Sequence, residues 1–159
     1  MTYGKANKND IPFLVELRIK YLLEDYGNLS EDKLTTITNN LYPYFEAHLN
    51  KDLFVFVCKD ADIIVSCCFL CVFEKPSNPT FINGKTGTIL NVYTKPEYKK
   101  NGIAGTLLKM LIDESENLKL DFLELKATVS GYNLYKSIGF EDAVSKYHNM
   151  KFIINSDNV

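Results

Sequence analysis

The stretch from Asn91 to Leu111, NVYTKPEYKKNGIAGTLLKML, constrains the fold most, because it joins a strand to a helix through a short basic turn that contains glycine. The apolar residues before Pro96 predict a strand that ends at the proline. After Gly102 the apolar residues recur at helical spacing, which predicts an amphipathic helix. The first N–H groups of such a helix lack intrahelical partners and carry partial positive charge. The turn by itself is equally typical of a phosphate site and of a tight corner.

The other segments predict further strands and helices around this unit. A strand at 2–7 precedes a helix that begins after Asp10 and ends at Gly27, and a second helix begins after Ser30. Pro43 lies inside the second helical pattern and predicts a kink or two shorter helices. The remaining expected elements are a hairpin of strands at 52–59 and 61–73, a strand at 88–94, the helix after Gly102, a strand at 121–128, a helix at 131–138 and a last strand at 146–154.

This order, β-α-α-β-β-β-α-β-α-β(β), predicts an α/β (α+β) fold with a mixed, mostly antiparallel central sheet flanked by helices. It weighs against a doubly wound nucleotide-binding fold. The turn also lacks both the P-loop pattern and the G-x-G-x-x-G fingerprint. A length of 159 residues fits a single domain spanning 1–159. The long polar connection 74–87, with two prolines, is expected to be mobile and to shape a substrate pocket.

Bulk composition narrows the range of partners and compartments. The net charge of −2 argues against broad binding of nucleic acid. No apolar run reaches the length of a membrane span, and the first residues lack the apolar core of a signal peptide. A cytoplasmic protein that acts on a small molecule is expected, and a homodimer stays an open alternative. The four cysteines lie in apolar strands and are expected to be reduced core residues rather than metal ligands, so no metal is expected.

Two segments at the right separation, Lys99 to Ala104 and Tyr135 to Phe140, resemble motifs of the GCN5-related N-acetyltransferase (GNAT) family. The diphosphate motif of that family, [RQ]-x-x-G-x-[GA], is matched by the six residues from Lys99 to Ala104, and its later motif, Y-x-x-x-G-F, by Tyr135 to Phe140. The resemblance covers nearly the whole chain, from about residue 3 to 154. Lys99 stands in place of the usual arginine or glutamine and loses the planar fork. Thr128 stands where many members have asparagine.

The resemblance implies acetyl-CoA as the acyl donor and assigns residues to it. The backbone of Val92, Tyr93 and Thr94 would bind the pantetheine arm like an added strand. The diphosphate would lie on the turn, and Thr128 would contact the cofactor from the later helix. The turn residues assigned to the diphosphate are Lys99, Lys100, Asn101, Gly102, Ile103, Ala104, Gly105 and Thr106.

The transfer reaction needs a proton donor for the departing thiolate. A phenol with a pKa near 10 keeps its proton at neutral pH, and Tyr135 matches the family's general acid by position. The competing interpretation is a packed core tyrosine, one of ten in the chain. The sequence does not identify the general base. Glu24, Asp25 and Glu46 are acidic candidates in the helical region on the acceptor side, and each is also typical of a solvated surface charge.

The sequence therefore predicts an acyl-CoA-dependent N-acetyltransferase that acetylates a primary amine of a small molecule. The alternative is a non-catalytic GNAT-like module that binds or senses acyl-CoA. Resemblance of fold does not fix the acceptor, so the amine stays unassigned.

Overall fold

A computed structural model of the chain describes residues 1–154, which form a five-stranded sheet with the strand order β1-β2-β3-β4-β5. The strands are β1 (Thr2–Lys5), β2 (Leu53–Asp60), β3 (Ile63–Glu74), β4 (Lys85–Thr94) and β5 (Phe122–Glu124). Every neighbouring pair is antiparallel except β4 and β5, which run parallel. The predicted mixed, mostly antiparallel sheet is therefore confirmed.

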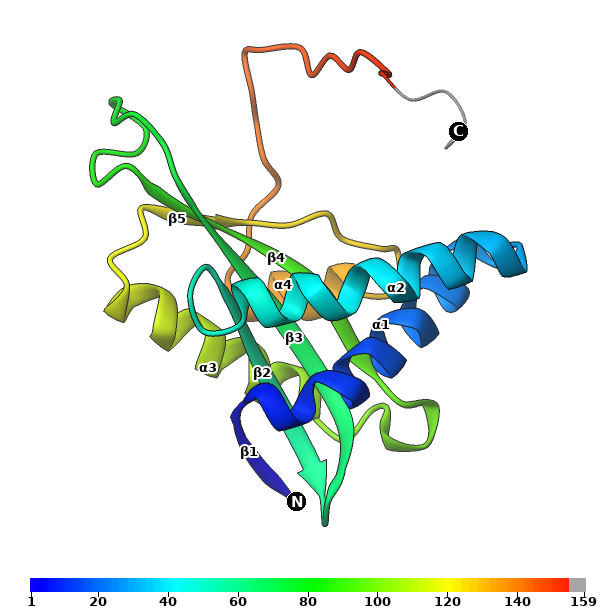
Figure 1. Ribbon diagram of the computed structural model, residues 1–159. Helices are drawn as coiled ribbons and strands as arrows, with labels where there is room; N and C mark the ends of the chain where they lie inside the picture. Colours follow the sequence, from blue (N-terminus) through cyan, green and yellow to red (C-terminus); the bar gives the residue numbers. More distant parts are fainter. Residues whose placement is uncertain (155–159) are drawn as a thin grey trace.

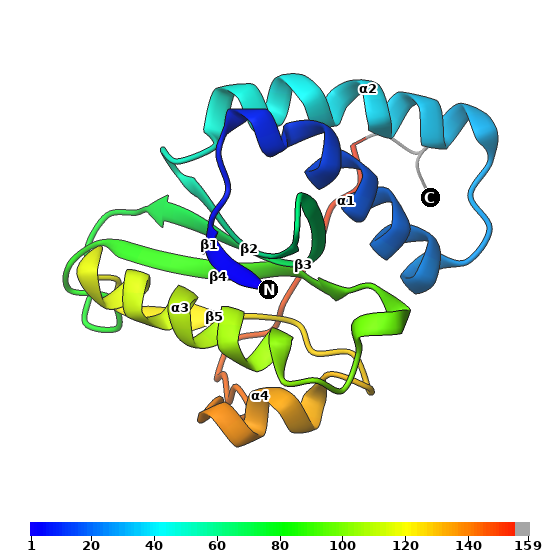
Figure 2. The ribbon, with the colours of Figure 1, turned by 90° about the horizontal axis from the view of Figure 1, so that it is seen from below.

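The helices cover the two faces of this sheet (Figures 1 and 2). One face carries α1 (Ile11–Tyr26) and α2 (Glu31–His48), and the other carries α3 (Ile103–Asn117) and α4 (Tyr132–Ile138). Two short 3-10 helices, Lys8–Asp10 and Pro96–Tyr98, precede α1 and α3. None of the helices in the described part of the chain has the length and apolar character needed to cross a bilayer.

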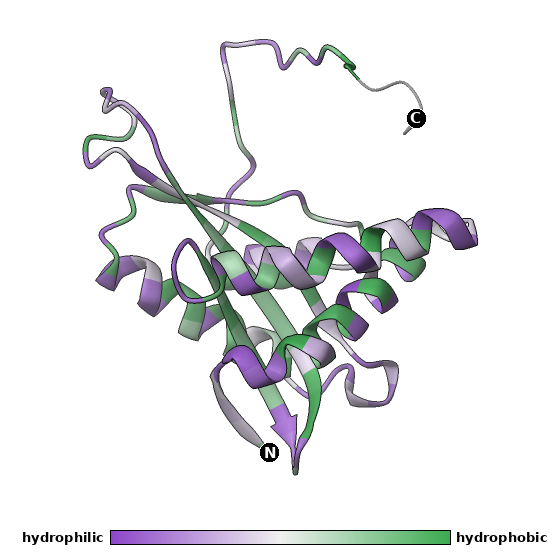
Figure 3. Cartoon of the chain, in the orientation of Figure 1, coloured by the Kyte–Doolittle hydropathy of each residue, from purple (hydrophilic) through white to green (hydrophobic). Residues whose placement is uncertain are grey.

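Alternation along the central strands builds two separate cores, because successive side chains of a strand point to opposite faces. Cys67, Phe69 and Cys71 of β3 pack under α1 and α2, whereas Cys68 and Leu70 pack under α3. The central strands are correspondingly apolar along their length, and the polar residues gather on turns and outer helix faces (Figure 3). The expected placement of the cysteines in the core is confirmed, since all four are buried and free.

Local signals set the ends of the helices much as predicted. Gly27 ends α1 with a positive φ of 72°, and the Ser30 hydroxyl accepts a bond from the Lys33 amide at the start of α2. Asp10 does not cap α1 with its side chain, because its carboxylate accepts from the Asn7 amide and pairs with Lys59. The expected division of the second helix is wrong, since α2 continues through Pro43 as one element.

The last predicted strand, 146–154, is also wrong. Through residue 154 the chain after α4 forms no strand and is exposed, and in Figure 1 it extends past the end of the sheet. Its apolar residues include Tyr147, Met150 and Phe152, which are 73%, 94% and 89% exposed. Its apolar residues predicted a strand, but none of the strands within residues 1–154 pairs with it. An extended segment without a hydrogen-bonded neighbour is not a strand.

The connection between β3 and β4 spans 75–84, within the predicted 74–87. The turn is closed by one backbone bond, from the Lys75 amide to the Gly84 carbonyl, and Asp121 accepts from the amides of Asn83 and Lys85. These contacts hold the hairpin against the segment that leads into β5, at the far end of β4 from Thr94. No residue of the connection lines either of the two cavities described below, so its expected role in shaping a substrate pocket is not supported.

Candidate functional site

A bulge interrupts β4 near its C-terminal end and redirects its side chains. Tyr93 pairs with Cys67 and Leu90 pairs with Phe69, so Asn91 and Val92 together oppose a single residue of β3. Asn91 adopts a positive φ of 50°, a conformation that asparagine tolerates better than most residues. As a result Leu90 and Asn91, although adjacent, both face the side of α1 and α2, which regular alternation would forbid.

Beyond the bulge, β4 has an open edge on the side of β5. The two strands pair only from Thr86 to Thr88, opposite Phe122 to Glu124, and then diverge. The segment assigned to the pantetheine arm, Val92 to Thr94, pairs with β3 on one side and has no neighbouring strand among residues 1–154 on the other. An open strand edge offers backbone donors and acceptors to an extended ligand.

The glycine turn delivers its backbone to the start of α3 as the sequence indicated. Gly102 is the residue before the helix, with a φ of 75°, and a side chain built on it would meet no atom within 4 Å. The first-turn amides of Ile103, Ala104 and Gly105 have no intrahelical acceptor, so they can bind an anion. Thr106 differs, because its amide and its hydroxyl both donate to the Gly102 carbonyl, at 3.1 and 3.3 Å.

The side chains around the turn are less free than its backbone. Lys99 points to Glu24 of α1, with Nζ 2.9 Å from Oε2, and lies over the Tyr93 ring. The Tyr93 hydroxyl donates to the other oxygen of Glu24 at 2.9 Å. Burial and this bond raise the pKa of Tyr93 well above its usual value. Lys100 is exposed and adopts a positive φ of 65°, which helps to reverse the chain before Gly102.

The later motif forms part of α4 and the residues after it. The residues of this region, including Thr128 before the helix, make different contacts. The Thr128 hydroxyl accepts from the Gly131 amide at 3.2 Å, so in this structure Thr128 caps the turn that begins α4. The ring of Tyr135 packs edge-on against Phe140 of the same motif, with ring centres 6.0 Å apart. Within residues 1–154 the Tyr135 hydroxyl makes no hydrogen bond. Burial, with smaller contributions from Tyr21 and Cys68, raises the pKa of Tyr135 to about 12.

The acidic candidates for a general base are separated by the fold. Glu46 lies near the C-terminal end of α2 and pairs with Lys8 at 3.5 Å. Glu24 is held by Lys99 and Tyr93, as described above. Asp25 is exposed and accepts a long bond of 3.5 Å from the Tyr21 hydroxyl. None of the three carboxylates therefore lies both near β4 and free of a protein partner.

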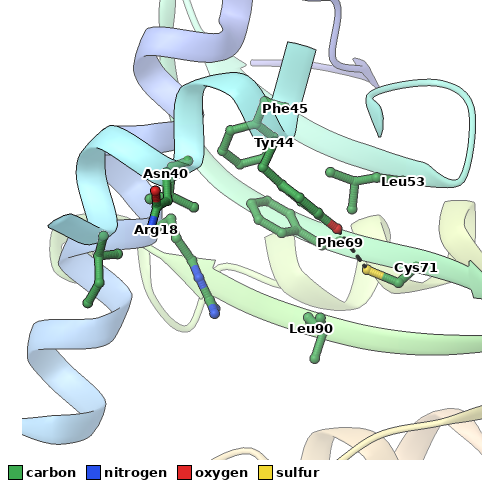
Figure 4. A pocket seen from close by; sticks show the side chains of 10 residues that line it. Arg18, Asn40, Tyr44, Phe45, Leu53, Phe69, Cys71 and Leu90 are labelled. Carbon is green, nitrogen blue, oxygen red and sulfur yellow. Dashed lines mark hydrogen bonds between the residues drawn. The ribbon is translucent and has the colours of Figure 1, made fainter. Parts of the chain in front are cut away.

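Two cavities on the α1 and α2 face meet at Arg18. The first, of about 360 Å³, lies between α2 and the central strands and is lined by Arg18, Ile37, Asn40, Leu41, Tyr44, Phe45, Leu53, Phe69, Cys71 and Leu90 (Figure 4). The second, of about 590 Å³, lies between α1 and α2 and is lined by Arg18, Leu22, Tyr26, Leu29, Asp32, Lys33, Thr36, Ile37 and Leu41. The first cavity reaches Leu90, one residue before the bulge.

Arg18 and Asn91 are functional candidates that sequence reasoning missed. The Arg18 guanidinium donates to Asn91 Oδ1 at 3.1 Å, and the Asn91 amide donates to Cys67 Sγ at 3.4 Å. Burial raises the pKa of Tyr44 to about 12, and the charge of Arg18 opposes that rise. One signal was available for Arg18: it is the only arginine in the chain. The sequence gives no signal for the bulge, because the apolar run that contains it has the pattern of an ordinary strand.

Comparisons with known proteins agree with this geometry. The model of the acetyltransferase (GNAT) domain matches residues 51–142, whereas no curated protein matches the chain in sequence. A predicted acetyltransferase from Clostridium acetobutylicum, solved with acetyl-CoA, is 28% identical with a TM-score of 0.83, over 94% of this chain and 95% of that one. A GCN5-related N-acetyltransferase from Ralstonia eutropha JMP134 is 20% identical with a TM-score of 0.78, over 94% and 97%.

A more distant structure, glucosamine-6-phosphate N-acetyltransferase from Arabidopsis thaliana, shares the fold at 14% identity and a TM-score of 0.68, over 97% of this chain and 98% of that one. Because the matched family model spans more than half of the chain and contains both the glycine turn and Tyr135, the chain belongs to the GCN5-related N-acetyltransferase (GNAT) family.

Proposed function

We propose that this protein is an N-acetyltransferase that moves an acetyl group from acetyl-CoA to a primary amine of a small molecule. The observation that carries the proposal is the divergence of β4 from β5. It leaves the edge of Val92 to Thr94 open, between the start of α3 and the cavity that reaches Leu90. An acyl donor lying on this edge would present its reactive end to an acceptor in that cavity.

The residues of the turn fit the donor's diphosphate. Three first-turn amides of α3 face an approach that Gly102 leaves open, and the helix dipole adds positive charge there. Lys99 and Lys100 supply further cations, although Glu24 already neutralises Lys99 in part. Since Thr106 uses its amide within α3, we assign diphosphate binding chiefly to Ile103, Ala104 and Gly105 and not to the Thr106 backbone.

Acetyl-CoA supplies an activated acetyl group, and the chain's residues supply position and a proton. In the transfer the amine nitrogen bonds to the acetyl carbon, the carbon–sulfur bond breaks, the amine loses a proton and the sulfur gains one. Tyr135 keeps its proton at neutral pH and its hydroxyl has no acceptor among residues 1–154, so we assign it the donation to sulfur. A backbone N–H beside the bulge would polarise the acetyl carbonyl.

The amine must attack in its neutral form. For a lysine-like amine this costs about 4–5 kcal/mol at neutral pH, because its pKa lies more than three units higher. The first cavity is lined by apolar side chains apart from Arg18, Asn40 and Tyr44, and such walls favour the neutral amine by desolvation. The positive charge of Arg18 acts in the same direction.

Release of free thiol from acetyl-CoA across a panel of small primary amines, with the product mass determined for each, tests the proposal. We expect thiol release that depends on the amine and a product heavier by one acetyl group. Tight binding of acetyl-CoA without turnover of any amine would instead favour the alternative, a non-catalytic acyl-CoA sensor.

A further inference from the structure

The chain's only arginine lies where the two cavities meet. Arg18 lines both, and in Figure 4 its nitrogen atoms project toward the space beside Leu90. Within residues 1–154 it forms no ion pair and one hydrogen bond, to Asn91 Oδ1. A guanidinium carries five N–H donors in a planar fork, so most of its donors have no protein acceptor.

The surroundings of Arg18 leave its charge uncompensated. No acidic side chain from residues 1–154 lines the first cavity, and the remaining walls are apolar or neutral. Asp32 lines the second cavity together with Lys33, so that pair adds no net charge. The guanidinium is also held in place, because Asn91 binds one nitrogen and the Tyr21 ring lies 5.4 Å from its centre. A half-buried, positioned and unpaired guanidinium is a binding site for one anionic group.

We infer that the acceptor is an amino acid with an apolar side chain, whose carboxylate binds Arg18 and whose side chain fills the cavity. This inference rests on the proposed function. Asn91 directly precedes the segment that would bind the thioester, and consecutive Cα atoms are about 3.8 Å apart. The anion-binding group and the reacting centre therefore lie close together, which suits an amine and a carboxylate on neighbouring atoms.

The single charge favours a carboxylate over a phosphate. A phosphate monoester carries about −1.5 to −2 charges at neutral pH and would leave a net negative charge beside one guanidinium. A carboxylate carries one charge and matches the fork with two parallel hydrogen bonds. The side chain of the acceptor would contact Ile37, Leu41, Tyr44 and Phe69, four of the residues that line the first cavity.

Kinetic comparison of amino acids with their decarboxylated amines tests the inference. The pairs are L-leucine with 3-methylbutylamine and L-phenylalanine with 2-phenylethylamine. In the wild type we expect kcat/KM to favour the amino acid at least about 10-fold, the typical effect of a charge-assisted hydrogen bond. Arg18→Gln should abolish this preference and Arg18→Lys should keep part of it. Lys20→Gln should retain it in full, since Lys20 lies on the same helix but pairs with Glu16 on the surface.

Acetyl-CoA affinity, measured by calorimetry, should be the same in all four proteins, which shows that the variants are folded. Should Arg18→Gln fail to fold, the test is the partial loss of preference expected for Arg18→Lys. The inference is overturned if the wild type accepts the amines as readily as the amino acids, or if the preference survives in both Arg18 variants.

A binding experiment separates this inference from the proposed function. Calorimetry with N-acetyl-L-leucine, in the presence of CoA, measures the carboxylate site without turnover. Weaker binding to Arg18→Gln than to wild type, in a protein that turns over no amine, would support the carboxylate site and contradict the proposed transfer. Equal binding by wild type and Arg18→Gln would contradict the carboxylate site, whether or not amines are acetylated.

Discussion

Tyr135 carries the chemical step in this account, and it shares a short helix with a second tyrosine that serves as its control. Tyr135 is half-buried and its hydroxyl has no partner in the described part of the chain, whereas Tyr132 is 40% exposed and donates to Asp142. Tyr135→Phe should lower kcat about 10²–10⁴-fold, the usual contribution of general acid catalysis. Acetyl-CoA affinity should change little, and Tyr132→Phe should leave kcat near wild type. A Tyr135→Phe protein that turns over normally would remove this residue from the mechanism.

The raised pKa of Tyr135 predicts how kcat and the stability of the protein depend on pH. Because the pKa is about 12, the phenol keeps its proton over the whole working range, and kcat should show no loss between pH 8 and 10 from this residue. Above pH 10 the Tyr135 hydroxyl of the unfolded chain loses its proton before that of the folded protein does. The contribution of Tyr135 to the free energy of unfolding is therefore lost as the pH rises from 10 toward 12. An alkaline decline near pH 9 that is absent from Tyr135→Phe would contradict the assignment.

At the scale of elements, we propose that the turn before α3 binds the donor through its backbone. Gly102→Val should abolish acetyl-CoA binding, because the side chain would occupy the open approach to the first-turn amides and strain a positive φ. Gly27→Val is the matched control. Gly27 also has a positive φ and open space around it, but it ends α1 and lies outside the turn.

Both glycine variants should lose stability, and calorimetry should show loss of acetyl-CoA affinity in Gly102→Val alone. Equal acetyl-CoA affinity in wild type and Gly102→Val, with both proteins folded, would refute the assignment of the turn.

The elements also show which parts of the molecule a sequence can predict. The strand, turn and helix around Gly102 were predictable, because proline, glycine and helical spacing act locally. The bulge at Asn91 was not predictable, because a bulge is defined by how β4 pairs with β3. The residue pattern of this segment is that of an ordinary strand. The predicted last strand, 146–154, was wrong for a related reason: its apolar residues are typical of a strand, but a strand also needs a neighbouring strand to pair with.

At the scale of the whole molecule, two cores share the central strands, and the adjacent cysteines Cys67 and Cys68 serve one core each. Cys68 is fully buried among apolar residues under α3. Cys68→Ser should lower the free energy of unfolding by about 1–3 kcal/mol, the cost of burying a poorly paired hydroxyl. Denaturant unfolding measures this change, while kcat of the folded enzyme should stay unchanged. A stable but inactive variant would give Cys68 a functional role instead.

The proposed site draws on residues from both faces of the sheet, and the sequence suggested only its donor side. The donor side consists of local motifs, the glycine turn and the segment around Tyr135, and both stand out in the sequence. The acceptor side brings Arg18 of α1 together with Asn91 of β4, seventy-three residues apart, and neither belongs to a motif. Contacts between distant segments of this kind follow from packing, which the spacing of residues does not reveal.

The most direct test follows the acetyl group itself. With acetyl-CoA labelled with ¹³C at the carbonyl, and the best amine from the panel, NMR should show the thioester signal replaced by an amide signal. One equivalent of free thiol should appear for each amide, and Tyr135→Phe should slow both signals equally. Thiol release with labelled acetate as the product, or no amide from any amine, would contradict the account.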